Sequence, residues 1–352
     1  MTSIPDQTAR AWADVSLGAI VANAQTVATV AGTRLIPMIK ANGYGVGAVP
    51  VARALEPLEP WGYGVATAEE GAELRAAGIT RPILVFSPLS PAQVGQHLVH
   101  HLRPVICDSD GLRVWLAAGP RPFHVEIDTG MSRTGFRWDT DPSWWEGLRN
   151  AEGWEGVFTH FHSAEDDSRS VSQQWDRFRA VLSTLPGRPP MIHAANSAAA
   201  LLGKTYACDA VRPGIFLYGG SAAGFTAQAA VRLRARVLAL RDVRAGETVS
   251  YGGTWRAPHD CRVATLGIGY ADGILRSLSN RGAVELGGRV VSMVGRVTMD
   301  FVMVVVDGRI AVGDVATIFG GLISLDEQAR RGATISYELL TAMGPRIARR
   351  YS

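Results

Sequence analysis

The sequence is poor in the features that mark secreted and membrane-spanning proteins. It has only three cysteines among 352 residues, Cys107, Cys208 and Cys261, and none of them belongs to a CxxC pair. Neither a disulfide framework nor a zinc site is therefore expected. No uninterrupted apolar run approaches the roughly 20 residues of a membrane span, and residues 1–10 are too polar for a signal peptide. We expect a soluble, cytoplasmic protein.

A strong charge of one sign is also missing. The 35 basic and 32 acidic residues leave a net charge of +3, and no Lys/Arg run forms a stripe for nucleic acid. The basic residues are mostly arginines, which suit anion recognition at single points. A hydrophobic fraction of 47% is that of a well-packed globular protein, and the length favours two domains. We expect a small-molecule partner, and neither nucleic acid nor a membrane.

Apolar segments alternate with helical or loop segments over the first two thirds of the chain. Strands are predicted at 12–16, 61–66, 82–86, 104–107, 123–128, 154–159, 191–194 and 211–215, besides one that ends near Lys40. Amphipathic helices are predicted at 17–30, 49–55, 68–77 and 171–185. This rhythm is typical of an α/β fold, here an N-terminal (β/α)8 TIM-type barrel over residues 11–230, whose chemistry lies at the carboxyl ends of the strands.

The residue composition and the hydrophobic periodicity change near Ala229. Val231–Leu240 is rich in β-formers, glycines punctuate short strands, and helical periodicity returns only at Tyr337–Ile347. We predict a C-terminal all-β domain over residues 231–352. The strand near residues 11–16 has an alternative place against this domain.

The segment Leu35–Gly47 places one cation between an apolar half and a glycine-rich half. The apolar half predicts a short buried strand, and the glycine-rich half predicts a loop. Lys40 stands where the two halves meet, and an amine is costly to desolvate there. It is either a nucleophile with a lowered pKa or an ordinary lysine that has emerged into solvent, and this segment alone does not decide between them.

The loop 128–136 follows a predicted strand and carries one arginine. Arg133 offers a planar guanidinium that can bind a carboxylate through two hydrogen bonds. It could equally pair with Asp128 or Glu126 at the surface, where an isolated ion pair contributes little.

The segment Thr159–Ser163 carries two histidines, two residues apart. On a strand they would share a face, so a metal site completed by Glu165 or His193 is conceivable. The favoured interpretation is that His160 acts alone, as a hydrogen-bond donor that orients a neighbouring group, and we expect no metal.

Further polar groups stand at predicted element ends. Asn196 or Ser197 would cap a short helix, where a hydroxyl can bind phosphate or act as a plain cap. Arg212 follows the last barrel strand. Tyr251 and Tyr270 lie beside glycines in the second domain, and composition alone does not separate a functional role from a packing role.

Nine segments, taken together and in this order, resemble alanine racemase, a fold-type III enzyme that uses pyridoxal 5′-phosphate. The resemblance runs from Trp12 to Tyr337 and includes Ile39-Lys40-Ala41-Asn42-Gly43-Tyr44-Gly45, Thr159-His160-Phe161 and Val249-Ser250-Tyr251-Gly252. It implies a homodimer with shared active sites that interconverts L-alanine and D-alanine and supplies D-alanine for peptidoglycan. Racemisation of another small amino acid, such as serine, is the alternative.

The resemblance also implies a role for each matched residue. Lys40 would bind the cofactor covalently and serve as one of two bases. Tyr251, oriented by His160, would be the other base and would come from the neighbouring subunit. Arg212 would face the ring nitrogen, and Arg133 would lie near the cofactor's phenolic oxygen and the substrate carboxylate. The other implied cofactor-binding residues are Tyr44, Asn196, Ser197, Gly214, Ile215 and Tyr337. The other implied substrate-binding residues are Met299, Tyr270 and Asp300.

Two different bases suit this chemistry. Racemisation removes a proton from one face of Cα and returns a proton to the other face, so a lysine and a tyrosine on opposite faces perform it directly. A non-catalytic carrier of the cofactor would not need a second domain that bears a tyrosine. A decarboxylase of related fold would not need the second base.

Some positions depart from the family pattern around the site. Many members carry a carbamylated lysine two residues before the Asp-Thr-Gly loop, where this chain has Glu126. We expect Glu126 to supply the negative charge that holds Arg133. Ser132 and Thr298 replace the usual glycine and cysteine, and these changes leave substrate breadth open.

Overall fold

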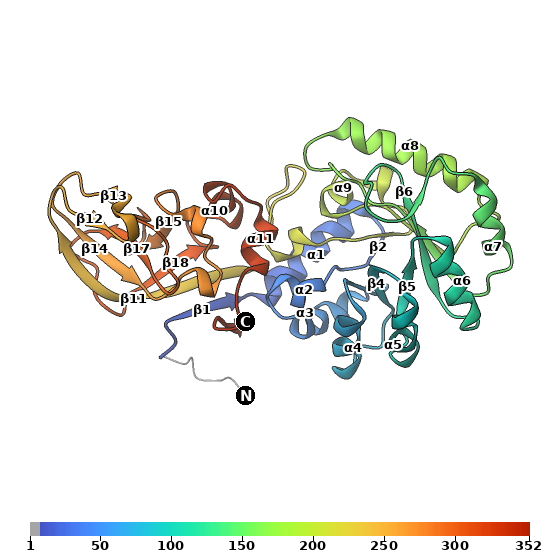
Figure 1. Ribbon diagram of the computed structural model, residues 1–352, viewed down its shortest axis with the longest axis horizontal. Coiled ribbons are helices and arrows are strands. Elements are labelled where there is room, and N and C mark those ends of the chain that lie inside the picture. Colours follow the sequence, from blue (N-terminus) through green and yellow to red (C-terminus); the bar gives the residue numbers. More distant parts are fainter. Residues whose placement is uncertain (1–7) are drawn as a thin grey trace.

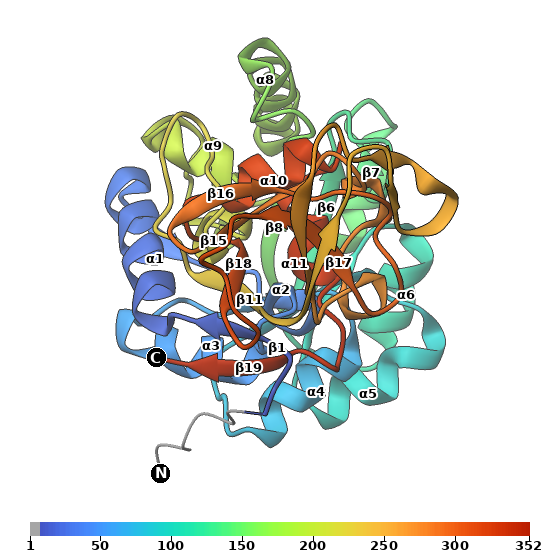
Figure 2. The same cartoon turned by 90° about the vertical axis from the view of Figure 1, so that its left-hand side faces the viewer.

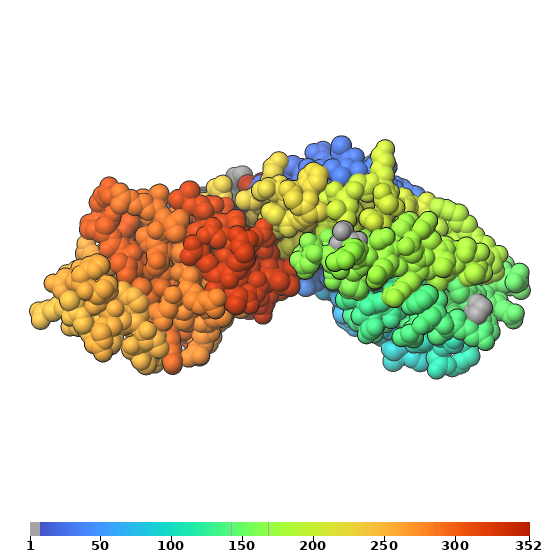
Figure 3. Space-filling model, turned by 90° about the horizontal axis from the view of Figure 1, so that it is seen from above, coloured from blue at the N-terminus to red at the C-terminus, as the bar shows by residue number. Residues whose placement is uncertain are grey.

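The computed structural model describes residues 8–352, apart from the side chains of residues 142 and 168, and it has two lobes (Figure 1). One lobe is a barrel wrapped by helices, and the other is built mainly of antiparallel strands. The space-filling view shows the two lobes separated by a narrower waist (Figure 3).

Eight parallel strands form the first lobe. In spatial order they are β2 (Arg34–Leu35), β10 (Ala210–Val211), β9 (Met191–His193), β8 (Trp154–Phe158), β6 (Phe123–Asp128), β5 (Arg103–Ile106), β4 (Ile83–Pro88) and β3 (Tyr63–Val65). The two ends of this sheet meet after β2, because Gly64 of β3 exchanges backbone hydrogen bonds with Pro37 and Ile39. The predicted barrel is confirmed. The short β7 (Phe136–Arg137) pairs with β6 outside this order.

Helices cover the outside of the barrel (Figure 2). They are α1 (Leu17–Ala31), α3 (Ala48–Leu55), α4 (Ala68–Ala76), α5 (Val94–Val99), α6 (Ser109–Ala117), α7 (Glu146–Arg149), α8 (Ser168–Thr184) and α9 (Ser197–Leu201). Four of them confirm the helices predicted from periodicity, with shifted ends. α4 begins in a capping box made by Thr67 and Glu70, as helix starts of this composition favour. Over the described residues, no helix combines the length and apolarity needed to cross a bilayer.

Two strands that lead to the site are shorter than predicted, and proline explains both. Regular pairing of β2 with β10 ends at Leu35, because Pro37 falls opposite Pro213 in this register and neither residue has an N–H to donate. Met38 instead forms a single bridge with Gly64 of β3. β10 ends at Val211, two residues before Pro213. The predicted strand 211–215 therefore gives way to a 3-10 turn over Ile215–Tyr218.

The second lobe is organised around the long strand β11 (Val231–Val243). It pairs with β14 (Cys261–Leu266), β18 (Val315–Phe319) and β1 (Ala11–Val15), so the N-terminal strand lies in this sheet. The other strands are β12 (Thr248–Val249), β13 (Trp255–Arg256), β15 (Ala283–Leu286), β16 (Arg289–Ser292), β17 (Val302–Val306) and β19 (Ala348–Tyr351).

Helical structure in this lobe differs from the sequence expectation. α10 (Leu325–Arg331) lies before the predicted helix, and α11 (Ser336–Thr341) ends well before Ile347. The last residues form β19, which runs parallel to β1. The helix thus ends ahead of Gly344 and Pro345, two residues that disfavour helical structure, and the strand begins only after them.

Candidate active site

Lys40 begins a left-handed turn at the mouth of the barrel. This turn, α2 (Lys40–Tyr44), has φ angles of 52°, 52°, 60° and 55° at Ala41, Asn42, Gly43 and Tyr44. The left-handed conformation costs a non-glycine residue roughly 1–2 kcal/mol, so side-chain contacts must hold it. Glu70 accepts the N–H of Ala41 at 2.6 Å, and the Asn42 side chain accepts the N–H of residue 48 at 2.9 Å. The predicted loop is therefore a fixed turn.

The amine of Lys40 is half-buried among positive groups. Burial lowers its pKa, Arg133 and Arg212 lower the pKa further, and the carboxylate of Glu70 raises it. A lowered pKa increases the fraction of neutral amine, which is the nucleophilic form. Of the two interpretations of Lys40, the structure favours the nucleophile.

A cavity beside Lys40 gathers most of the predicted barrel residues. It is lined by Met38, Lys40, Tyr44, Phe86, Arg133, His160, Asn196, Ser197, Arg212, Gly214 and Tyr337. Tyr337 comes from α11 of the second lobe, and the others come from the barrel. Met38 and Phe86 were not predicted, although each lies at or near the carboxyl end of a barrel strand, where the fold places chemistry.

Hydroxyl groups meet on one side of this cavity. The Oγ atom of Ser197 accepts the N–H of Gly214 at 2.8 Å. A Cβ atom at Gly214 would lie 2.2 Å from the Tyr44 hydroxyl, so only glycine admits that hydroxyl here. The ring of Tyr44 lies 5.9 Å from the ring of Tyr337, centre to centre. Burial raises the pKa of both tyrosines, so their hydroxyls stay protonated and can donate.

A backbone amide and a helix cap complete this group of donors. Ile215 is buried, and its N–H donates to no acceptor within the described part of the chain. Such orphaned amides are rare unless a ligand satisfies them. Asn196 caps α9 by accepting the N–H of Ala199 at 3.0 Å, which fixes Ser197 as the first helical residue. Hydroxyl and amide donors of this kind fit a phosphate group.

Arg212 is buried at one end of the cavity. Its Nη2 donates to the carbonyl oxygens of Thr159 at 2.8 Å and Ala194 at 3.0 Å, and it lies 3.2 Å from Nδ1 of His160. Burial lowers the pKa of Arg212 to about 10, so the guanidinium remains protonated at neutral pH. Because arginine has no acceptor, a proton on Nδ1 of His160 would face a donor, so the proton of the neutral ring lies on Nε2. Burial and Arg212 lower the pKa of His160, which keeps the ring neutral.

Glu126 does not hold Arg133, contrary to the expectation from sequence. Its carboxylate is buried and accepts hydrogen bonds from Thr134 Oγ1 at 2.8 Å and Cys107 Sγ at 3.3 Å. Arg133 makes no ion pair or hydrogen bond with any residue that the structure describes. The charge of Glu126 instead favours the protonated form of Arg212. The guanidinium of Arg133 is left for a ligand.

The two histidines of the Thr159–Ser163 segment do not converge. His160 faces Arg212, whereas His162 is exposed and lies 2.6 Å from the hydroxyl of Ser163. Within residues 8–352, no group of three His, Cys, Asp or Glu side chains has the arrangement of a metal site.

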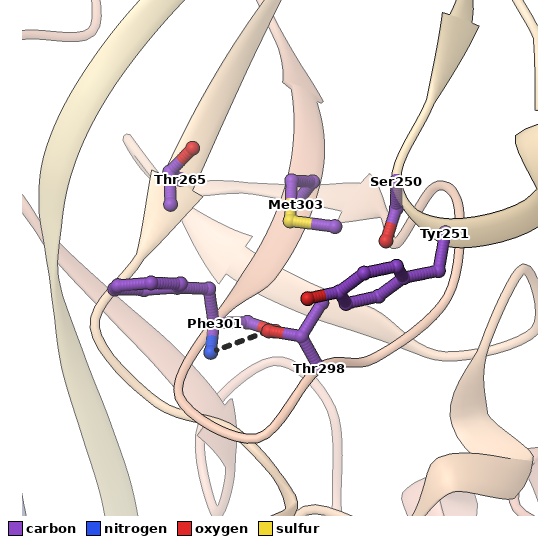
Figure 4. A pocket seen from close by; sticks show the side chains of 6 residues that line it. All are labelled: Ser250, Tyr251, Thr265, Thr298, Phe301 and Met303. Atoms are coloured by element: carbon purple, nitrogen blue, oxygen red, sulfur yellow. Dashed lines mark hydrogen bonds between the residues drawn. The ribbon is translucent and has the colours of Figure 1, made fainter.

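The remaining predicted residues form a second cluster on the C-terminal lobe. Figure 4 shows Tyr251, which follows β12, beside Thr298, whose hydroxyl accepts the N–H of Phe301 at 3.0 Å. The loop 298–301 includes Met299 and Asp300, and its carbonyl groups at Thr298 and Met299 accept the N–H groups of residues 270 and 271. Large side chains of this cluster are exposed, with Tyr251 at 72% and Met299 at 53%. Exposed apolar clusters of this kind commonly mark an interface.

The two clusters do not meet within one chain. Figure 1 shows the hairpin β12–β13 at the far tip of the second lobe, whereas α2 lies at the centre of the molecule beside α11. A single subunit therefore does not bring Tyr251 to Lys40.

Comparisons with known proteins agree over the whole length. The families "Alanine racemase, N-terminal domain" and "Alanine racemase, C-terminal domain" match residues 15–222 and 230–351. An alanine racemase of Deinococcus radiodurans is 37% identical over 353 residues, covering 97% of this chain and 99% of that protein. The crystal structure of alanine racemase from E. faecalis has a TM-score of 0.91 at 32% identity and covers 100% of both chains. An alanine racemase structure from Bartonella henselae, with covalently bound pyridoxal phosphate, has a TM-score of 0.89 at 30% identity and covers 98% of this chain and 100% of that one.

Proposed function

The chain belongs to the alanine racemase family, and from this premise we propose that it interconverts L- and D-alanine with pyridoxal 5′-phosphate, using Lys40 and Tyr251 as bases. One observation carries the proposal: a lysine with a lowered pKa shares a cavity with phosphate-type donors and a buried arginine. The covalently bound cofactor in the Bartonella henselae relative supports the choice of cofactor.

The residues present fit this cofactor. Tyr44, Ser197 and Tyr337, with the amide of Ile215, would bind its phosphate, while the N–H of Gly214 and the cap at Asn196 would hold Ser197 in place. The amine of Lys40 would bind its aldehyde carbon. When bound, the cofactor withdraws electrons from the substrate Cα and makes its hydrogen removable. Arg212 would face the ring nitrogen as a donor that cannot give up its proton.

Lys40 and a tyrosine would exchange protons with opposite faces of Cα. Because Tyr251 is remote from Lys40 in its own chain, we propose a homodimer in which the partner subunit's Tyr251 enters the site. A tyrosine with an ordinary pKa near ~10 is a poor base unless donors stabilise its phenolate. His160 can donate from Nε2, since Arg212 already occupies its Nδ1.

The substrate carboxylate would bind the guanidinium of Arg133 through two hydrogen bonds. The backbone amide of the partner subunit's Met299 would add a donor. The partner subunit's Tyr270 and Asp300 would line the approach to the site. Asp300 is held for this role by Arg346, whose Nη1 lies 2.9 Å from its carboxylate. The product D-alanine would serve peptidoglycan synthesis in the cytoplasm.

A chiral assay tests the proposal. Purified protein should convert either enantiomer of alanine into an equal mixture, because enantiomers have equal free energy. Tyr251→Phe should lower kcat by about 10²–10⁴-fold, the usual contribution of a general base, while the yellow colour of the bound cofactor remains. Conversion of serine in the same assay would define substrate breadth. A fully loaded protein that forms no D-alanine would refute the function, and full activity of Tyr251→Phe would refute the two-base assignment.

A further inference from the structure

A continuous chain of hydrogen bonds crosses the barrel interior behind Arg212. Nη1 of Arg212 lies 2.6 Å from Nδ1 of His193, and Nε2 of His193 lies 2.9 Å from Nδ1 of His124. Nε2 of His124 lies 3.3 Å from Oε2 of Glu155. Arg103 holds this carboxylate through Nε at 2.6 Å and Nη2 at 3.3 Å.

The chain joins the two rims of the barrel. Glu155 and His124 are each the second residue of their strands, β8 and β6, and so lie near the amino-terminal rim. His193 is the last residue of β9, and Arg212 follows β10 directly. In such barrels the amino-terminal rim usually serves stability and the other rim serves chemistry. Here a polar connection links them.

The groups at the two ends of this hydrogen-bond chain fix the direction in which its hydrogen bonds are donated. Arginine can only donate hydrogen bonds, and an ionised carboxylate can only accept them. Arg212 therefore donates to Nδ1 of His193, His193 donates from Nε2 to His124, and His124 donates from Nε2 to Glu155. Both imidazoles must be neutral. Both nitrogens of a charged imidazole carry protons, so one of its N–H groups would point at a neighbouring donor. Burial lowers the pKa of both histidines, in agreement with this arrangement.

The surrounding residues are shaped to admit these rings. A Cβ atom at Gly156 would lie 2.3 Å from Nδ1 of His124, so the absence of a side chain there makes room for the ring. The ring of Phe158 stacks on His193 at 4.8 Å, centre to centre. Both histidines have 0% exposure. Apolar side chains would fill a barrel interior at a lower cost in desolvation free energy than buried polar groups. We take this as an indication that the hydrogen-bond chain has a role in the site at the barrel mouth.

We propose that Glu155 is a positioning residue for racemisation: through His124 and His193, it holds the guanidinium of Arg212 in the orientation that faces the cofactor's ring nitrogen. A carboxylate behind an imidazole fixes its tautomer and strengthens the acceptor on its other nitrogen, and hydrogen bonds in a chain polarise one another. The two imidazoles carry this effect from the rim to Arg212. What Arg212 faces rests on the proposed function, but the chain of hydrogen bonds does not.

Nitrogen-15 NMR of the histidine-labelled holoenzyme, as a solid, tests the chain directly. His193 and His124 should show one nitrogen–nitrogen correlation across their shared hydrogen bond. Both rings should be neutral, with the proton on Nε2. A charged ring, or a proton on Nδ1 of either residue, would overturn the proposal whether or not the protein racemises alanine.

Two variants test the positioning role. Glu155→Gln keeps an acceptor oxygen and loses the charge, whereas Glu155→Ala loses both. Glu155→Ala should lower kcat for alanine by about 10–100-fold, the usual effect of removing such a supporting carboxylate, with little change in KM and with a shifted signal from Nδ1 of His193. Glu155→Gln, which preserves shape, should lose less activity and shift the same signal in the same direction.

The exposed Glu152, close to the start of the same strand, provides the matched control. Glu152→Ala should change neither the His193 signal nor kcat. If Glu155→Gln, folded and loaded with cofactor, leaves both the signal and kcat at wild-type values, the positioning role is wrong. If the wild-type protein is inactive but shows the expected histidine signals, the proposed function is wrong, and the hydrogen-bond chain is still supported.

Discussion

The carboxylate of Glu70 accepts the backbone N–H of Ala41 at 2.6 Å with one oxygen and the N–H of Ala66 at 2.7 Å with the other. One side chain thus ties the turn after Lys40 to the segment between β3 and α4. Because Ala41 is the first left-handed residue of that turn, this contact opposes its backbone strain. It also places a negative charge near the amine.

Opposite charges around Lys40 should shift its reactivity in opposite directions. Arg133→Met removes a positive neighbour and should raise the pKa of the amine, whereas Glu70→Gln removes a negative neighbour and should lower that pKa. Since the neutral amine reacts, the rate at which stripped protein recaptures the cofactor should rise at higher pH in Arg133→Met and at lower pH in Glu70→Gln.

The control for this experiment is the other lysine of the sequence. Lys204 is exposed, and Lys204→Arg leaves Lys40 as the sole lysine side chain. Borohydride should then fix the cofactor to Lys40 in full yield. Shifts of the same sign in Arg133→Met and Glu70→Gln would contradict the electrostatic account.

The contact between Gly214 and Tyr44 predicts a defect in cofactor affinity. In Gly214→Ala the new Cβ atom would lie 2.2 Å from the Tyr44 hydroxyl. That hydroxyl must then leave its place among the donors proposed to bind the cofactor phosphate. Loss of a hydrogen bond to a charged group costs about 1.5–3 kcal/mol, which corresponds to about a 10–100-fold higher Kd. Cofactor titration followed by fluorescence measures this. Gly187→Ala is the matched control, because Gly187 is exposed and nothing lies within 4 Å of its added Cβ.

Buried histidines should make the fold sensitive to acid. Burial lowers the pKa of His97, His124, His160 and His193 in the folded protein. Below the ordinary histidine pKa of about 6.5, the unfolded chain therefore binds more protons than the folded one, and stability falls by about 1.4 kcal/mol per pH unit for each such histidine. The midpoint of thermal unfolding, at fixed protein concentration, should drop steeply below that pH.

Two substitutions separate this effect from general acid damage. His97→Asn, remote from the cavity, should reduce the slope of stability against pH by the share of one histidine. His259→Asn, at an exposed position, should leave the slope unchanged. Equal slopes in wild type and His97→Asn would contradict the assignment.

Sequence patterns predicted the barrel because its strands are short apolar runs between helices of regular period. They failed where a single residue type ended a strand, as Pro37 and Pro213 do. The left-handed conformation of the turn after Lys40 could not be predicted from the sequence either. Its glycine at 43 is permissive, but Ala41 and Tyr44 ordinarily favour right-handed conformations, and the distant Glu70 stabilises the turn.

The site residues at the barrel mouth were predicted because they match the motifs of a known family. The residues that hold them in position, such as His124 and His193, were not predicted in that role. His124 and His193 are 69 residues apart, and they meet only because of the order of strands in the barrel. Glu126 shows the converse error. Its place, where many family members carry a carbamylated lysine, suggested that it holds Arg133, but the fold directs its carboxylate to Thr134 and Cys107. A family pattern does not report which side chains face each other once a residue at that position has changed.

The central claim is that each active site combines Lys40 of one subunit with Tyr251 of the other. Heterodimers of Lys40→Ala and Tyr251→Phe chains, isolated through two different tags, test it most directly. Both homodimers should be nearly inactive. Each heterodimer would contain one intact site and one site with both substitutions, so its activity should be about half that of the wild-type dimer. A heterodimer no more active than the two mutant homodimers, while a wild-type dimer with the same tags is fully active, would contradict the claim.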